Sequence, residues 1–347
     1  MSRKSKKTVL LTGASSFLGA HTLLTLNRQF NVIGVYNKTP LTFVDTPTFQ
    51  IDLTSPSSYE ALQNLEVDWV VHLAGKIQSS KEMTATQCNR KMLDAVLSLN
   101  KPIVYASSTA VRWEYDIPYV QIRKEDEQRI VNSGLPYVIV RPSAPYGPKI
   151  PGYAPKHKES FQTLVDFVRR APIIPIIGDG KYLRQPIHAT DFANLIGYCM
   201  LENETHIAFD AAGSTTHTFN EVVQILQAKI HRTRPLLHIP KKIAILGSRL
   251  FGNLEPSLVR AMDSSETFDV QSIQERISLK GFEDGYLDFY SIKKDGVSNS
   301  VLIIDNFKVK EVPVFAKLLS LASLQGIADL LTGEGIRFTD FEMRYSS

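Results

Sequence analysis

The chain has 347 residues, of which 43% are hydrophobic and 21% charged, as in a soluble globular protein with one large or two ordinary domains. The net charge of +4 comes partly from the N-terminal RKSKK stretch, so composition favours no nucleic acid partner. The two cysteines, Cys88 and Cys199, lie too far apart in the sequence for a metal site and fit a reducing compartment, so we expect a cytoplasmic protein without a metal centre.

Apolar strand-like segments alternate with segments of helical spacing along the first 142 residues. The strands are predicted at 8–13, 31–37, 68–75, 101–108 and 135–142, and helices at 19–29 and 89–100. This alternation predicts an α/β fold with a Rossmann-type, doubly wound parallel sheet. Such sheets bind ligands at the carboxyl ends of their strands. The start lacks a cleavage site for secretion, and no apolar run is long enough to span a membrane.

The first predicted strand ends in TGASSFLGA, residues 12–20. Gly13 allows a tight turn, and Gly19 allows the following helix to pack close to the strand. The amides at the helix start are expected to hold a pyrophosphate, helped by the hydroxyl of Ser16, which stands where a third glycine is common. An ordinary strand-to-helix turn is the alternative. The predicted cofactor-binding residues here are Gly13, Ser15, Ser16, Phe17, Leu18 and Gly19.

The ends of the next strands bear on the choice of cofactor. An acidic residue after the second strand would bind the ribose hydroxyl of NAD, but Asn37 and Lys38 stand there. Lys38 favours the 2′-phosphate of NADP, with a surface lysine as an equal alternative. Asp52 and Leu53 are placed to read the adenine, although Asp52 could instead cap a helix that begins near Ser55.

Eight motifs occur in an order that resembles a known family. They are TGASSFLG, DL at 52–53, HLAG at 72–75, YASSTAV at 105–111, the helix of Tyr119, LPYVIVRPSAPYGP at 135–148, GDGKYLRQPIHATDFA at 178–193 and GSTTHTFNEVVQIL at 213–226. Together they resemble the extended short-chain dehydrogenases/reductases, the NAD-dependent epimerases and dehydratases that act mainly on nucleotide sugars. The resemblance covers about residues 7–245. It implies a bound nicotinamide dinucleotide, a small-molecule substrate and a smaller C-terminal substrate region.

The resemblance also implies catalytic residues. Tyr119 matches the family's acid/base tyrosine, and a tyrosine, which titrates near ~10, needs a positive neighbour to act at neutral pH. The family has lysine one helical turn later, where this chain has Arg123. Arg123 can supply charge but does not readily release a proton. A plain amphipathic helix with Glu125 paired to Arg129 is the alternative. Ser108 matches the residue that binds the substrate oxygen, and Thr109 is the fallback.

Further site residues follow from the same resemblance. Ala74, Gly75, Pro142, Ser143 and Ala144 are predicted to contact the cofactor. Arg184 matches an arginine that binds the substrate's diphosphate, whereas His188 and Asp191 are expected to be structural. Only ten residues separate Ser108 from Tyr119, fewer than the family usually has. The short loop, which contains Trp113, predicts a different substrate wall.

The last hundred residues depart from the family pattern. Residues 284–347 resemble the C-terminal repeat of AsmA-like bacterial envelope proteins, with predicted strands at 300–309 and 336–345 and an apolar helix within 312–331. A divergent dehydrogenase tail is the alternative. We predict a nucleotide-binding core at 1–170, a substrate region at 171–265 and an extension at 266–347, while segment 268–282 could belong to either side of that last boundary.

These features predict an NAD(P)-dependent oxidoreductase, epimerase or dehydratase, with NADP favoured over NAD, acting on a nucleotide sugar or another small carbonyl or hydroxyl compound. Peripheral membrane contact through 312–331 and a homodimer are further expectations. Two other classes remain open. One is a non-catalytic dinucleotide-binding scaffold or sensor, and the other is a membrane-associated protein led by its C-terminal segment.

Overall fold

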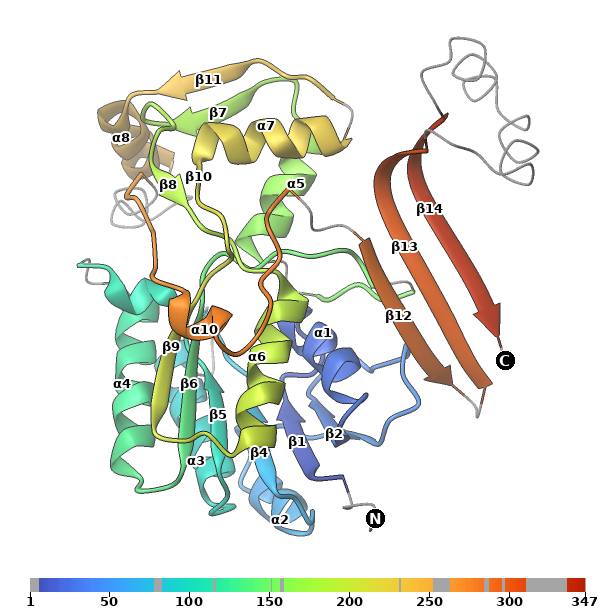
Figure 1. The fold of residues 1–347 in the computed structure, drawn as a ribbon. Coiled ribbons are helices and arrows are strands. Elements are labelled where there is room, and N and C mark those ends of the chain that lie inside the picture. The colour runs from blue at the N-terminus through green and yellow to red at the C-terminus, as the bar shows by residue number, and fades with distance from the viewer. Residues whose placement is uncertain are drawn as a thin grey trace.

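The structure is a computed structural model that describes residues 6–77, 83–114, 117–150, 152–156, 159–230, 232–251, 263–283, 287–294, 297–309 and 336–346. Its centre is a parallel seven-stranded sheet of order β3-β2-β1-β4-β5-β6-β9. The strands are β1 (Thr8–Thr12), β2 (Asn31–Tyr36), β3 (Thr48–Gln50), β4 (Trp69–His72), β5 (Ile103–Ala106), β6 (Tyr137–Pro142) and β9 (Ile207–Ala211). The predicted Rossmann-type sheet is therefore confirmed (Figure 1).

Helices cover both faces of this sheet. Successive side chains along each strand point to opposite faces, and those on both faces are buried and apolar. Val9 and Leu11 of β1 pack with helices α1 (Phe17–Leu26) and α6 (Ala189–Glu202). Leu10 faces the other side, where α2 (Ser57–Gln63), α3 (Ala85–Leu97) and α4 (Pro118–Asn132) contribute apolar side chains. Burial on both faces explains why these strands are continuous apolar runs in the sequence.

A smaller lobe lies beyond the carboxyl ends of the strands (Figure 1). It contains α5 (Ser160–Arg170), β7 (Ile174–Ile177), β8 (Leu183–Arg184), β10 (His217–Thr218), α7 (Phe219–Ile230), β11 (Leu236–Ile239) and α8 (Lys241–Phe251). Its strands form two pairs, β7 with β11 in parallel and β8 with β10 in antiparallel. The lobe has its own apolar cluster, in which Tyr146 and Phe282 are fully buried.

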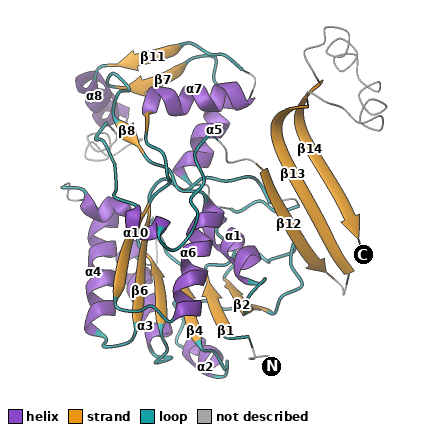
Figure 2. Cartoon of the chain, viewed as in Figure 1, coloured by secondary structure: helices purple, strands orange, loops and turns teal. Residues whose placement is uncertain are grey.

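The segment after the smaller lobe returns to the main body (Figure 2). It contains the short helix α10 (Gln271–Gln274). Val270 and Ile273 are buried in the same cluster as α1 and α6, and Phe282 joins the cluster of the smaller lobe. Residues 268–282 thus contribute to the packing of both parts. The domain boundary at residue 266 stays a prediction.

The C-terminal residues include a three-stranded antiparallel sheet of β12 (Leu287–Lys294), β13 (Val297–Val309) and β14 (Ile336–Ser346). Two of these strands fall where strands were predicted. The apolar helix predicted within 312–331 lies outside the described residues, and the resemblance to AsmA-like proteins stays a prediction. Among the residues that the structure describes, no helix is long and apolar enough to cross a membrane.

Candidate active site

The predicted cofactor residues gather at the carboxyl edge of the main sheet. Gly13 follows β1, Ala74 and Gly75 follow β4, and Ser108 lies two residues beyond β5. The parallel arrangement brings these strand ends to one edge, as the sequence predicted. Asn37 and Lys38 follow β2 at the same edge and are exposed.

The glycine loop is packed too closely for side chains at two positions. Gly13 has a φ of +69°, and a Cβ there would lie 2.6 Å from the backbone nitrogen of Ala74. A Cβ on Gly19 would lie 2.1 Å from the carbonyl oxygen of Gly13. Such contacts are impossible, so both positions require glycine. Ser16 caps α1 by accepting a hydrogen bond from the Gly19 amide at 2.9 Å, while Phe17 and Leu18 are buried.

The adenine end of the predicted site is formed by the turn after β3. The Asp52 carboxylate accepts hydrogen bonds from the amide and the hydroxyl of Thr54, at 3.0 and 2.7 Å. These bonds, led by the amide, lower the pKa of Asp52, and Lys38 adds to the effect. The cap of α2 is Pro56, so Asp52 stabilises its own turn rather than the helix start. Leu53 is buried beside it.

Arg123 lies next to the predicted acid/base residue. Tyr119 and Arg123 lie one turn apart in α4, and the guanidinium carbon is 5.3 Å from the centre of the Tyr119 ring. Arg123 is buried, with 8% of its surface exposed, whereas Tyr119 is half-buried. A Cβ added to Gly75 would lie 2.6 Å from Nη2 of Arg123. The guanidinium therefore occupies the space between the Tyr119 ring and the loop after β4.

A buried polar chain holds Arg123 in this place. Its Nη1 donates to the Tyr105 hydroxyl at 2.7 Å and more weakly to the Ala106 carbonyl at 3.4 Å. The Tyr105 hydroxyl in turn donates to Asp126 at 2.8 Å. Burial raises the pKa of Tyr105 above its usual range, so the hydroxyl keeps its proton and remains a donor. Tyr105 and Asp126 were not predicted as site residues.

Ser108 and Thr109 differ in what they can reach. Ser108 is half-buried and caps the short 3-10 helix Thr109–Arg112 by accepting from the Ala110 amide at 3.2 Å. Its hydroxyl proton remains available to a substrate oxygen. Thr109 is buried, and its hydroxyl faces the Pro142 carbonyl at 3.5 Å. This geometry favours Ser108 over Thr109 as the predicted substrate contact. The Thr109 side chain is buried against the loop after β6.

The loop after β6 is held both by the smaller lobe, through the residue after β8, and by β9 of the main sheet. The Ser143 hydroxyl donates to the Gln185 carbonyl, and the Ser143 amide donates to the Ala211 carbonyl at 2.9 Å. Pro142 and Ser143 are buried, while Ala144 is half-buried. The Ser143 side chain therefore fixes the loop. Because this hydroxyl is already bonded, we expect the loop to contact a cofactor through its backbone atoms.

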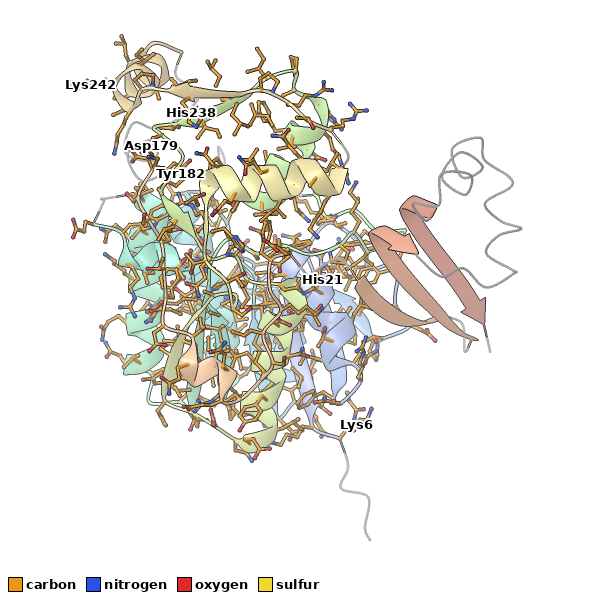
Figure 3. The ribbon with its side chains drawn as sticks, turned by 45° about the horizontal axis from the view of Figure 1, so that its top comes forward. Lys6, His21, Asp179, Tyr182, His238 and Lys242 are labelled. Atoms are coloured by element: carbon orange, nitrogen blue, oxygen red, sulfur yellow. The ribbon has the colours of Figure 1, made fainter. Side chains whose placement is uncertain are left out.

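Arg184, the predicted diphosphate ligand, lies in β8 and stacks on the Tyr182 ring with its guanidinium carbon 4.6 Å from the ring centre. Figure 3 labels Tyr182 in the smaller lobe. Arg184 lies 3.9 Å from a carboxylate oxygen of Glu266. The same carboxylate accepts a hydrogen bond from Trp113 at 2.5 Å. Glu266 was not predicted as a site residue.

The ion pair between Glu125 and Arg129, considered as an alternative role for these residues of α4, does not form. Glu125 and Arg129 do not pair within α4, because Glu125 binds Arg90 of α3 at 2.6 Å and Arg129 binds Asp94 of the same helix. Both side chains thus tie α4 to α3. His188 caps α6, and Asp191 accepts from the Lys280 amide at 2.7 Å, which agrees with structural roles.

These residues fit a nicotinamide dinucleotide. The close packing at Gly13 and Gly19 holds the turn after β1 against the loop after β4 and sets the start of α1 at the carboxyl edge of the sheet, where a helix start favours a pyrophosphate. Arg123 at Gly75 places a fixed positive charge at the next strand end. The described residues contain no cluster of three metal-ligating side chains.

Comparison with known proteins defines the family. The model of the NAD dependent epimerase/dehydratase family matches residues 9–129 and 126–210, more than half of the chain. The chain belongs to the NAD dependent epimerase/dehydratase family. Its predicted family, enzyme class and requirement for a nicotinamide dinucleotide are thereby confirmed, with NAD as the cofactor that the family description names. Preference for NADP gains no support.

Solved structures share the fold of this chain. UDP-glucose 4-epimerase from Thermotoga maritima, solved with UDP-glucose, has a TM-score of 0.63 at 16% identity over 80% of this chain and 96% of its own. The epimerase Mth375 from Methanothermobacter thermautotrophicus has a TM-score of 0.64 at 16% identity, covering 81% and 90%. UDP-glucose 4-epimerase from Thermus thermophilus, solved with NAD, has a TM-score of 0.61 at 17% identity, covering 80% and 96%. No match was found among curated proteins.

Proposed function

We propose that this epimerase/dehydratase family member moves a hydride between NAD and a hydroxyl-bearing carbon of a nucleotide sugar. The observation that supports this most is the position of Arg123, buried between the Tyr119 ring and Gly75. Structures of the same fold carry UDP-glucose or NAD, which supports the choice of substrate and cofactor class.

The chain's own residues divide the work. NAD, when bound, supplies the hydride acceptor. Tyr119 takes the proton of the substrate hydroxyl and returns it, while Ser108 donates a hydrogen bond to the same oxygen. Arg123 keeps a positive charge beside Tyr119 but passes no proton, because a guanidinium does not deprotonate in proteins. A proton that moves between Tyr119 and solvent therefore does not pass through Arg123.

The finer properties are also proposals. Lys38 is exposed after β2, and its positive charge supports NADP as a second cofactor to test beside NAD. Arg184 is proposed to bind the substrate's diphosphate. A homodimer, a cytoplasmic location and membrane contact through 312–331 remain proposals drawn from the sequence.

Titration with NADH and NADPH, followed by nicotinamide fluorescence, tests the cofactor proposal. We expect micromolar binding of NADH by both the wild type and Tyr119→Phe. With UDP-glucose and NAD, the wild type should form a product that Tyr119→Phe does not. If the folded protein binds neither cofactor, the oxidoreductase proposal is wrong and a non-catalytic scaffold is the better interpretation. If Tyr119→Phe turns over substrate as fast as the wild type, Tyr119 is not the acid/base residue.

A further inference from the structure

The carboxylate of Glu266 connects two parts of the predicted substrate site. One oxygen accepts from Nε1 of Trp113 at 2.5 Å, and the other lies 3.9 Å from Nε of Arg184. Trp113 belongs to the loop that precedes α4, whereas Arg184 belongs to β8 in the smaller lobe. Trp113 also packs with Tyr119 against one small apolar cluster. The carboxylate is thus connected through Trp113 to the apolar cluster of the predicted acid/base residue and lies beside the predicted diphosphate ligand.

The backbone fixes Glu266 in this position. Its amide donates to the Leu183 carbonyl at 2.9 Å, and the Leu183 amide donates to the Ser265 hydroxyl at 3.0 Å. Nη1 of Arg184 donates to the Ser264 carbonyl at 2.5 Å. The side chains of Arg184 and Glu266 are each 15% exposed. Since the segment is bonded along β8, the carboxylate is built into the site.

The charge of Arg184 is already compensated. Burial lowers the pKa of Arg184, whereas Glu266, Tyr182 and Asp263 act in the opposite direction. Glu266 is the largest of these opposing effects, and Asp263 also binds Lys241 at 2.5 Å. A diphosphate on Arg184 would bring further negative charge beside the Glu266 carboxylate, and like charges at this range repel.

We propose that Glu266 is a specificity-determining residue that competes with the substrate's diphosphate for Arg184. The inference rests on the proposed function, in which Arg184 is the diphosphate ligand. A nucleoside diphosphate binds when the Glu266 carboxylate moves away from Arg184, and that movement breaks the hydrogen bond to Trp113. Glu266 therefore keeps the affinity for nucleoside diphosphates below the level that Arg184 alone would give.

Calorimetric titration with UDP tests this competition. Glu266→Gln removes the charge and keeps an oxygen that accepts from Trp113, so we expect it to bind UDP about tenfold more tightly, equivalent to roughly 1.4 kcal/mol. Glu202→Gln, at an exposed position of α6, removes the same charge elsewhere and should bind UDP as the wild type does. Trp113→Phe removes the hydrogen bond that holds Glu266 and should also strengthen binding.

Tryptophan fluorescence reports the movement separately. The chain has two tryptophans, and Trp69 is buried in β4. UDP should therefore change the fluorescence of the wild type, and Trp113→Phe should lose that change. Equal or weaker UDP binding by Glu266→Gln, or no UDP binding by any of these proteins, overturns the competition. NADH titration of the same samples separates the outcomes, because intact NADH binding leaves the proposed function standing.

Discussion

Nη1 of Arg123 donates a hydrogen bond to the hydroxyl of Tyr105 at 2.7 Å, in the interior of the protein. This bond gives a physical reason for an arginine at the position where the resemblance implies a lysine. One nitrogen of the guanidinium serves Tyr105, while Nη2 rests against Gly75 and the guanidinium plane lies near the Tyr119 ring. A lysine ammonium is a single point on a flexible stem and cannot make these contacts together.

Arg123→Lys is therefore expected to impair the protein rather than restore a family site. The substitution leaves the buried hydroxyl of Tyr105 without its donor, which should lower the free energy of unfolding by about 1–3 kcal/mol. Urea unfolding of the two proteins measures the loss. Adding Tyr105→Phe removes the orphaned hydroxyl, so the double variant should lose less than the sum of the single losses. Strictly additive losses would show that the two side chains are not coupled.

Asp126 gives this chain of hydrogen bonds a pH dependence. Burial, the largest effect, raises the pKa of Asp126 above its ordinary value of 3.8, while Tyr105 and Arg123 act against it. The native state then binds more protons than the unfolded chain between pH 3.8 and the raised pKa, so stability falls as pH rises through that window. Asp126→Asn does not titrate. The unfolding free energy of the wild type minus that of Asp126→Asn should decrease with rising pH, and a constant difference would contradict the shift.

The fold was predictable from the sequence because its central strands are buried on both faces. Segments 68–75 and 101–108 are apolar runs, and they became β4 and β5 at the middle of the sheet. The glycine loop was also predictable, because the close approach of backbone segments at Gly13 and Gly19 excludes every larger residue. Local sequence is enough to define such features.

Contacts between distant segments were not predictable in the same way. The alternative interpretation of α4 paired Glu125 with Arg129 one turn away, but Arg90 of the neighbouring helix α3 is the partner of Glu125. Asp126 had a local signal, because it lies three residues after Arg123 on the same side of α4. Glu266 had none, since only folding brings it to Trp113 and Arg184.

Gly19→Ala is expected to abolish cofactor binding. Its Cβ would meet the Gly13 carbonyl oxygen at 2.1 Å, so α1 must move away from the strand and the amides at its start lose their position. We expect NADH affinity to fall below detection in a fluorescence titration of folded protein. Ser16→Ala removes the N-cap of the same helix and one predicted phosphate contact, so it should cost about 1 kcal/mol of stability and weaken NADH binding much less than Gly19→Ala does. Undiminished NADH binding by Gly19→Ala would place the cofactor elsewhere.

His21 should make the protein sensitive to mild acid. It lies in α1 within the main body (Figure 3), with its Nε2 3.1 Å from the Pro148 carbonyl. Burial, the largest effect, lowers its pKa from 6.5 to about 4. A lowered native pKa gives stability that is complete above pH 6.5 and lost as pH falls toward about 4.

At roughly 1.4 kcal/mol for each pKa unit, His21 accounts for about 3 kcal/mol of that acid loss. His21→Gln keeps a donor for Pro148 and cannot ionise, so its unfolding free energy should fall less between neutral pH and pH 4. His72 and His188, whose pKa values burial lowers to about 3 and about 2, should leave part of the loss in the variant. His238→Gln, at an exposed residue of β11, controls for the removal of a histidine. If wild type and His21→Gln lose stability in parallel on acidification, His21 is not the residue that titrates.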